Sequence, residues 1–250
     1  MTFRILTWNL NGLDDHRVDE RAEAAVFIAV TGLTLTQLAR GGTTRAAPDV
    51  LMFQEVTRHT YKAHLRIHLP KAGYAIYPAR PPESETFEVI AVRQPAVISK
   101  ARSVPLERSL YGRNLHIVEA TGVDEFGDGI RLLTAHFDSG TEESEVRIGE
   151  SRQTIAEMDN HSVFAGDTNL RNTEWESVAE WPTVADAWED LGRPADTRDT
   201  WQMFDRRARF DRVWLGRGLN VVSMEAVGRV SGGRMPPSDH VGLLVEIAVR

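Results

Sequence analysis

Short apolar or alternating runs recur along almost the whole of this 250-residue chain. Runs of this length, bounded by polar and turn-forming residues, are typical of β-strands. The strand candidates are FRILTWNL, DVLMFQEV, YAIYPA, FEVIAVR, NLHIVEAT, IRLLTAHF, SVFAGDTN, FDRVWLGR, VVSMEAV and VGLLVEIAV. A chain with so many short strands buries them as packed sheets or as a barrel, and no other feature limits the fold as strongly.

Helical patterns are fewer than strand patterns. Residues 18–42 have acids in their first turn and glycines at their end, which predicts a helix or a broken pair of helices. Residues 57–69 and 145–160 have apolar residues at spacings of three and four, as in a helix that covers a sheet. We expect one α+β domain over residues 1–250, with two packed sheets flanked by helices. The pattern assigns no role to the connection at 31–46.

Composition excludes several classes of function. The 29 basic and 36 acidic side chains give a net charge of −7, which argues against a generic basic coat for nucleic acid but allows a local cationic patch. The absence of cysteine excludes a disulfide-linked partner, zinc–thiolate sites and a cysteine nucleophile. The first ten residues lack a secretory leader, and no apolar run approaches the roughly 18 residues of a membrane span. We expect a cytoplasmic protein without membrane contact, acting as a monomer.

Polar side chains collect next to the ends of the predicted strands. They are Asn9 and Asn11; Gln54 and Glu55; His136, Asp138 and Ser139; Asp167, Asn169 and Arg171; and Asp211 with Ser238, Asp239 and His240. Loops at strand ends are where a rigid scaffold holds reactive groups. The repeated placement therefore predicts one shared site.

Each of these residues also has a purely structural interpretation. Asn9 can close a turn, and Glu55 can cap the helix that follows it. Asp211 can be a core acid paired with a neighbouring arginine, and His136 a hydrogen-bonded core histidine. Asp239 can belong to a turn without function. If the segments form no shared site, every one of these structural interpretations must be correct at the same time.

The functional interpretation needs only one site. A carboxylate such as Glu55, helped by amide oxygens, suits a hard cation that keeps most of its waters, which is typical of magnesium. A histidine held by an aspartate suits stabilisation of negative charge on phosphorus oxygens. A separate aspartate held by an asparagine suits activation of a water molecule. Together these groups predict metal-assisted hydrolysis of a phosphodiester or phosphomonoester.

Six motifs resemble, in order, those of the endonuclease/exonuclease/phosphatase superfamily. They are TWNLNG at 7–12, QEV at 54–56, TAHFDSG at 134–140, AGDTNLRN at 165–172, RFDRVWL at 209–215 and PSDHVGLL at 237–244. Within the superfamily the chain is most similar to the 5′-tyrosyl-DNA phosphodiesterases. The residues that indicate this branch are GDTNLR, the Thr200–Trp201 pair, RFDR, SDHVGLL and the GRNLHIVE stretch around Arg113.

The resemblance implies a fold, an activity and partners. The fold is a four-layer α/β/β/α sandwich of two mixed sheets flanked by helices, as in DNase I. The activity is hydrolysis of 5′-phosphotyrosyl bonds between DNA ends and protein or peptide, with Mg²⁺ as cofactor and Mn²⁺ as a substitute. The partners are single-stranded or frayed 5′ DNA ends, with or without a covalent tyrosyl peptide.

The resemblance also implies metal and charge-stabilising residues. Glu55 matches the principal Mg²⁺ ligand, with Asn11 and Asp239 near the ion. His240 matches the group that stabilises developing negative charge, and Asp211 matches its orienting partner. Asn11 stands where this branch usually has an aspartate, which removes one negative charge from the metal environment.

Further motif residues match groups that act on water and phosphate. Asp167 would orient or deprotonate the attacking water, while Asn9 and Asn169 position that water and contact the phosphate. His136 and Ser139 would grip the phosphate of the scissile or neighbouring nucleotide.

The remaining matches concern the DNA end. Arg171 would hold the single-stranded 5′ end, with Trp201 beneath the terminal base, and Arg113 belongs to the binding loops. Thr86 stands where this branch has a tyrosine that touches the substrate, so the strictness of the tyrosyl preference is open.

Two alternatives remain at this point. One is another phosphoesterase of the same superfamily: a DNA exonuclease, an abasic endonuclease, or a phosphatase for a small or lipid phosphate. Such an enzyme would share the metal and catalytic residues and differ in its binding loops. The other is a catalytically silent binding protein, which the joint presence of Glu55, Asp167, Asn169 and His240 disfavours.

Overall fold

The computed structural model describes residues 2–31, 47–122, 129–179, 183–230 and 235–250, and their strands form two main sheets. The first sheet has the order β13-β14-β1-β2-β4-β3 and the second β5-β6-β7-β8-β12-β9. The strands of the first sheet are β1 (Thr2–Asn9), β2 (Val50–Thr57), β3 (Tyr74–Tyr77), β4 (Thr86–Arg93), β13 (Leu219–Val227) and β14 (Gly242–Val249). Those of the second are β5 (Val97–Pro105), β6 (Asn114–Thr121), β7 (Ile130–Thr134), β8 (Ser162–Asp167), β9 (Val184–Asp186) and β12 (Asp211–Gly216).

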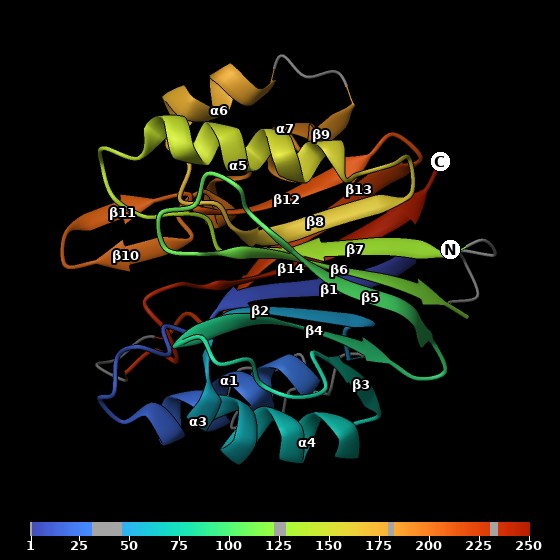
Figure 1. The fold of residues 1–250 in the computed structure, drawn as a ribbon, viewed down its shortest axis with the longest axis vertical. Helices are drawn as coiled ribbons and strands as arrows, with labels where there is room; N and C mark the ends of the chain where they lie inside the picture. Colours follow the sequence, from blue (N-terminus) through green and yellow to red (C-terminus); the bar gives the residue numbers. More distant parts are fainter. Residues whose placement is uncertain (1, 32–46, 123–128, 180–182, 231–234) are drawn as a thin grey trace.

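Helices cover the outer face of each sheet, so the layers run helix, sheet, sheet, helix (Figure 1). The helices beside the first sheet are α1 (Val18–Thr31), α3 (Arg58–Thr60), the π-helical turn η1 (Tyr61–Leu65) and α4 (Arg66–Lys71). Those beside the second are α5 (Ser144–Ala156) and α6 (Asn172–Ala179), whereas α7 (Ala187–Asp190) packs against β12 and β13 and contributes Ala187 to the core between the sheets. The short 3₁₀ turn η2 (Ala195–Thr197) precedes a small ribbon of β10 (Trp201–Met203) and β11 (Arg206–Ala208). Among the described residues, none of the helices is long and apolar enough to span a bilayer.

Both sheets are mixed, as predicted. β1 pairs in parallel with β2, and β7 with β8, while β12 pairs antiparallel with both β8 and β9. Side chains that alternate along the strands fill the spaces between layers. Ile5 and Met52 lie between the two sheets, whereas Leu6 and Trp8 face the helices of the first sheet and Phe164 faces those of the second. The four-layer α+β sandwich expected from the sequence is confirmed.

The structure refines three expectations about single elements. Within 18–42, residues 18–31 form α1, and the rest of that stretch, with most of the connection at 31–46, lies outside the described residues. Residues 57–69 form α3, η1 and most of α4 instead of one regular α-helix. β5 was absent from the strand candidates because most of its side chains are exposed and show no apolar alternation.

The central strands of both sheets bring the motif residues to one edge. β1 and β2 run in register with Asn9 opposite Gln54, so Asn9 at the end of β1 lies beside Glu55 near the end of β2. β12 is antiparallel to β8 with Asp211 opposite Asp167, so β12 begins where β8 ends. The residues just before β12 therefore lie beside the residues just after β8.

Gly166 allows the chain after β7 to lie against the end of β8. A Cβ atom at this position would lie 2.4 Å from the backbone oxygen of Ala135. The parallel pairing continues past this point, because His136 bridges to Asp167 and the Phe137 N–H donates to the Asp167 carbonyl at 2.8 Å. The close approach places the His136 ring beside the Asp167 carboxylate.

Candidate active site

One asparagine amide joins two carboxylates from different sheets. Asn9 Nδ2 donates to Asp167 Oδ2 at 2.9 Å and to Glu55 Oε1 at 3.3 Å. Its Oδ1 accepts the Asn11 backbone N–H at 2.8 Å, which fixes the orientation of the amide. Asn9 is fully buried, so these contacts form without competition from water. Three residues predicted to share a site therefore do so.

A bulge in β2 directs Glu55 toward this amide. The register of β2 with β4 shifts between Phe53 and Val56, and Glu55 has a left-handed φ of 51°. Bulges commonly re-aim a side chain next to an active site. A Cβ atom at Gly12 would lie 2.2 Å from the Glu55 carbonyl oxygen, so the loop after β1 can pass here only with glycine.

Burial raises the pKa of the Glu55 carboxyl, and the Asp167 carboxylate raises it further, against the hydrogen bond from Asn9. The Glu55 side chain keeps 17% of its surface exposed, whereas that of Asp167 keeps 2%. Two acids thus share a single amide donor in a poorly hydrated position. A cation bound beside them would relieve this repulsion.

His240 and Asp211 form a buried pair beside Asp167. His240 Nδ1 lies 2.7 Å from Asp211 Oδ2, and its Nε2 lies 3.6 Å from Asp167 Oδ2. Burial of the ring opposes its protonation, but the carboxylates of Asp211 and Asp167 outweigh burial and raise the pKa of His240 to about 10. The ring is therefore an imidazolium at neutral pH, with Nε2–H directed toward Asp167.

Hydroxyl groups hold both members of this pair. Ser238 Oγ donates to the Asn9 carbonyl at 2.7 Å and accepts the His240 backbone N–H at 3.1 Å. Thr200 Oγ1 accepts the backbone N–H groups of Phe210 and Asp211, each at 3.0 Å. These two residues position the pair through its backbone.

His136 lies between the two carboxylates that Asn9 joins. Its Nε2 is 3.4 Å from Asp167 Oδ2, and its Nδ1 is 3.6 Å from Glu55 Oε1. Burial lowers the pKa of His136 to about 3, so the ring is neutral at physiological pH. Nδ1 has no hydrogen-bond partner in the part of the chain that the structure describes, and this leaves a polar atom for a ligand.

Asn169 closes the turn that follows β8. Its backbone N–H donates to Asp167 Oδ1 at 3.0 Å, and its Nδ2 donates to the Phe137 carbonyl at 3.2 Å. The residue has a left-handed φ of 49°, a conformation that asparagine tolerates better than most residues. We call Asn9, Glu55, His136, Asp167, Asn169, Asp211 and His240 the catalytic cluster.

Phe210 connects the two side chains predicted to bind a DNA end. The Arg171 guanidinium lies over the Phe210 ring at 5.3 Å, and the Trp201 ring lies 5.3 Å from it at an angle of 40°. Arg171 also donates to the Asn169 carbonyl at 2.6 Å. We call Arg171, Trp201 and Phe210 the aromatic platform. Sequence reasoning missed Phe210, although it stands directly before Asp211 in the RFDR motif.

Arg113, Ser139 and Thr86 line a groove of about 590 Å³ on another side of the catalytic cluster. Arg113 donates to Thr86 Oγ1 at 3.2 Å and lies 5.8 Å from the Tyr111 ring. The Arg113 charge acts on Glu55, so the groove adjoins the carboxylates. The structure thus separates the predicted substrate residues into the aromatic platform and this groove.

A sequence profile of the Endonuclease/Exonuclease/phosphatase family matches residues 6–240. The chain belongs to this family. The matched range includes every residue of the catalytic cluster, from Asn9 to His240. The family predicted from the six motifs is confirmed.

Two members of the family illustrate the similarity in sequence. Tyrosyl-DNA phosphodiesterase 2 of Xenopus laevis is 30% identical, and the match covers 99% of this chain and 67% of the relative. The Mus musculus protein of the same name is 31% identical over 99% of this chain and 66% of its own length. This chain therefore spans about two thirds of each relative, and the predicted resemblance to the tyrosyl-DNA phosphodiesterases is confirmed.

Solved structures of the family share the fold. Humanized D. rerio TDP2 with 14 mutations has a TM-score of 0.79 at 25% identity, over 99% of both chains. D. rerio TDP2 complexed with a single-strand DNA product has a TM-score of 0.80 at 24% identity, again over 99% of both. The human Nocturnin catalytic domain with bound sulfate reaches 0.72 at 18% identity, over 100% of this chain and 94% of that one.

Family members of this kind use a divalent metal ion, and the donor atoms of the catalytic cluster fit one. Glu55 and Asp167 supply hard oxygen atoms that share one amide donor, and Asp211 Oδ1 is buried without a hydrogen-bond partner among the described residues. Oxygen-rich sites of this composition suit Mg²⁺ or Mn²⁺.

Two residues predicted near the metal make other contacts. Asp239 Oδ2 accepts the Trp201 indole N–H at 2.9 Å, and its Oδ1 accepts from Ser238 Oγ at 3.4 Å. Asn11 contributes its backbone N–H to Asn9. The structure therefore gives Asp239 a place beneath the aromatic platform, and the roles of Asn11 and Asp239 as metal ligands stay predictions.

Asp138 is a structural residue. Its carboxylate accepts the Ser109 hydroxyl and the Leu110 backbone N–H, both at 2.6 Å. It is fully buried and so anchors the loop that carries Arg113. The neighbouring Ser139 is exposed in the groove.

Proposed function

We propose that this protein hydrolyses the 5′-phosphotyrosyl bond between a DNA end and a protein or peptide, with Mg²⁺ as its cofactor. The observation that carries the proposal is the catalytic cluster, in which the His240 imidazolium lies 2.7 Å from Asp211 Oδ2 and 3.6 Å from Asp167 Oδ2, and Asn9 donates to the same Asp167 oxygen. Membership of the family and similarity to proteins named tyrosyl-DNA phosphodiesterase 2 support this substrate.

Asp167 is the group that orients the attacking water and accepts its proton. Its Oδ2 is held by Asn9 and its Oδ1 by the backbone N–H of Asn169, so both oxygens are fixed in direction. A base fixed in this way spends little free energy on orientation during the reaction.

His240 stabilises the negative charge that develops on the phosphate oxygens. Its partner Asp211 keeps the ring protonated and fixes its direction at 2.7 Å. A fixed cation in a buried position stabilises developing charge far better than a hydrated one. His136 is neutral, and its Nδ1 has no hydrogen-bond partner among the described residues, so it contributes a second polar contact to the phosphate.

A divalent ion held by Glu55 would polarise a phosphate oxygen and neutralise part of its charge when bound. Glu55 is suited to this role because burial and the Asp167 charge favour a cation beside it. Mg²⁺ is proposed as the natural ion and Mn²⁺ as its substitute, because both prefer oxygen ligands.

The phosphotyrosyl bond suits this set of groups. A phenol has a pKa of about 10, well below that of a sugar hydroxyl, so it leaves as an anion with little help from a general acid. The catalytic cluster supplies a base and positive charge, which are the groups that cleavage of a phosphotyrosyl bond requires.

The aromatic platform is the proposed binding surface for a single-stranded or frayed 5′ end. Arg171 lies against the face of Phe210, and Trp201 is half-buried beside the same ring. Stacking of bases on aromatic rings contributes about 1–3 kcal/mol per base without sequence preference. The D. rerio TDP2 structure with a single-strand DNA product supports this class of ligand.

The deciding experiment compares a 5′-phosphotyrosyl oligonucleotide with three other substrates: its 3′-phosphotyrosyl counterpart, an abasic duplex and an aryl phosphodiester. Each is incubated with Mg²⁺, with Mn²⁺ and with EDTA. We expect rapid metal-dependent release of tyrosine from the 5′ substrate alone. Cleavage confined to the abasic duplex or the small ester would contradict the proposed substrate and favour another phosphoesterase activity of the family.

A cytoplasmic location and a monomeric state also belong to the proposal. Light scattering on purified protein would test the monomer, and a dimer at micromolar concentration would contradict it. Cell fractionation would test the location.

A further inference from the structure

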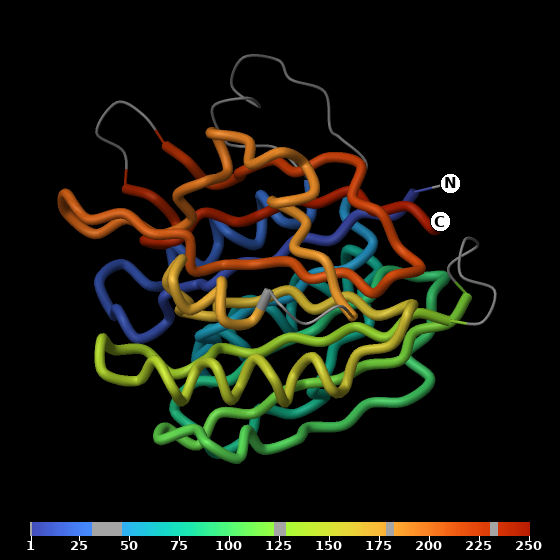
Figure 2. The backbone as a smooth tube through the Cα atoms, turned by 90° about the horizontal axis from the view of Figure 1, so that it is seen from above, coloured from blue at the N-terminus to red at the C-terminus, as the bar shows by residue number. Residues whose placement is uncertain are grey.

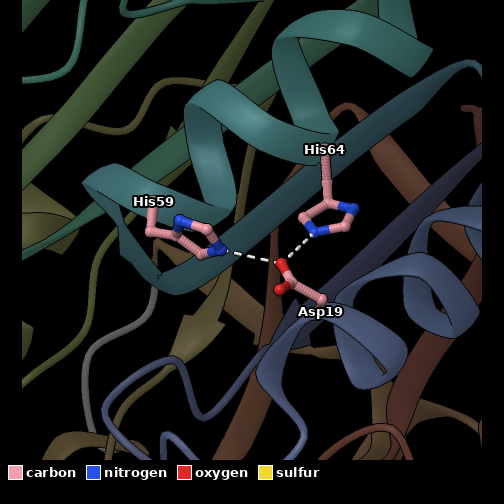
Figure 3. Close-up of side chains that lie close together, drawn as sticks. All are labelled: Asp19, His59 and His64. Carbon is pink, nitrogen blue, oxygen red and sulfur yellow. Dashed lines mark hydrogen bonds and ion pairs between the residues drawn. The ribbon is translucent and has the colours of Figure 1, made fainter.

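Three side chains meet in the helical layer that covers the first sheet. Asp19 comes from α1, His59 from α3 and His64 from the π-helical turn η1 (Figure 3). The Nε2 atoms of both histidines lie 2.7 Å from the same oxygen, Asp19 Oδ1. We call these residues the helix-layer triad. It lies in a different layer from the sheet edge that carries the catalytic cluster.

The π-helical turn explains why the two histidines face the same way. Residues five apart on an α-helix of 3.6 residues per turn point about 140° away from each other. In η1 the Arg66 N–H donates to the Tyr61 carbonyl, five residues back, so the turn is wider. His59 and His64 are also five residues apart and are brought onto one face. Such turns occur frequently at functional sites.

The triad offers the donors of a transition-metal site. Two imidazole nitrogens and one carboxylate oxygen all lie within 4.8 Å of one another. In a tetrahedral zinc site with bonds of about 2.0–2.1 Å, neighbouring ligand atoms are about 3.3 Å apart. The present distances of 2.7 Å between nitrogen and oxygen therefore need to open by only about half an ångström.

Burial favours this use of the triad. The His64 side chain is only 12% exposed, so one ligand is held by packing, while His59 and Asp19 are 59% and 63% exposed and can adjust. The exposed side leaves room for water as a further ligand.

We propose that Asp19, His59 and His64 bind a divalent transition-metal ion, Zn²⁺ in particular, and that this ion links α1 to the α3–η1 segment. Imidazole and carboxylate together suit zinc and its neighbours, whereas Mg²⁺ prefers oxygen ligands. The proposal concerns a site separate from the proposed phosphodiesterase reaction and does not depend on that reaction.

The test is a calorimetric titration of untagged, EDTA-stripped protein with Zn²⁺ in the presence of excess Mg²⁺. All proteins carry Glu55→Gln, which removes the predicted metal ligand of the active site and leaves the triad intact. We expect one Zn²⁺ per chain, and we expect His64→Ala or Asp19→Asn to weaken binding at least about tenfold. His161→Ala, which removes an exposed histidine from outside the triad, should leave the affinity unchanged.

Two further measurements distinguish a specific metal site from nonspecific binding. Co²⁺ bound at the triad should give visible absorption bands of a low-coordinate complex, and His64→Ala should abolish them. Zn²⁺ at about a hundredfold excess over Kd should raise Tm by about 5 °C or more, because the ion stabilises only the folded chain. Equal Zn²⁺ affinity in His64→Ala and His161→Ala, or no Zn²⁺ binding by the protein that carries Glu55→Gln alone, would overturn the proposal.

Discussion

Asn9 shows how much of this active site depends on single hydrogen bonds. Its one amide nitrogen holds carboxylates that the two sheets deliver separately, and its oxygen is fixed by the chain two residues on. Motif spacing predicted Asn9, Glu55 and Asp167 because the chemistry requires those residue types. The sequence could not predict the contacts that Phe210 and Thr200 make, because these contacts arise only when β12 pairs with β8 and the ribbon turns back.

The first prediction concerns the base. Asp167→Asn keeps the shape of the side chain and an oxygen for the Asn169 N–H, but it removes the negative charge that accepts a proton. We expect kcat on a 5′-phosphotyrosyl oligonucleotide to fall by about 10²–10⁴, with little change in the far-ultraviolet circular dichroism spectrum. Near-normal turnover by the folded variant would mean that another group is the base.

The second prediction concerns pH and the His240–Asp211 pair. The pKa of His240 is about 10 in the folded chain and about 6.5 when unfolded, so the folded state binds the proton more tightly. This stabilisation is complete below about pH 6.5 and is lost as pH rises through about 10. Denaturant unfolding of metal-free protein should show a loss of stability over this range that His240→Gln lacks. Parallel curves for the two proteins would refute the raised pKa.

At the scale of elements, the β10–β11 ribbon carries Trp201, one of the three residues of the aromatic platform. Its residue Trp201 bridges to His240 and donates to Asp239, so the ribbon is tied to the segment that precedes β14. Strands with buried faces were predicted well because apolar side chains repeat along them. The ribbon, the exposed strand β5 and the π-helical turn were not, because tertiary contacts and not local patterns determine them.

The third prediction concerns Trp201 on this ribbon and Phe210, which lies just after the ribbon in the chain. Trp201→Ala and Phe210→Ala remove stacking surfaces, so each should raise KM for a single-stranded 5′ end by about 5- to 150-fold and change kcat much less. Phe204→Ala is the matched control, because Phe204 is 90% exposed at the turn of the same ribbon. If Phe204→Ala raises KM as much as Trp201→Ala and Phe210→Ala do, the DNA end does not bind specifically on the aromatic platform.

At the scale of the whole molecule, the layer order and the converging strand ends determine where the site lies. The number of strand candidates and the family resemblance predicted the sandwich, and six ordered motifs predicted a single site. Neither predicted the strand order within each sheet, because pairing between strands distant in sequence depends on the packed core. The separation of the aromatic platform from the Arg113 groove likewise appears only in three dimensions.

The fourth prediction follows from the overall charge. From the net charge of −7 we expect no extended basic track, and therefore contact with only two or three phosphates. For single strands each contact lowers log affinity by about 0.7 per decade of salt, so fourfold more salt should weaken binding about 10-fold. Measurement of KM from 50 to 200 mM salt with a short oligonucleotide checks this. A loss above a thousandfold would reveal a longer track.

The pairing of β1 with β14 has one practical consequence. Thr2 lies opposite Ala248, so the first and last strands put the two ends of the described chain side by side (Figure 2). Asn9 is at the other end of β1, about 23 Å away at 3.3 Å per residue. A fluorescent protein or surface anchor fused to either end would therefore emerge far from the catalytic cluster, and we expect immobilised enzyme to remain accessible to its substrate.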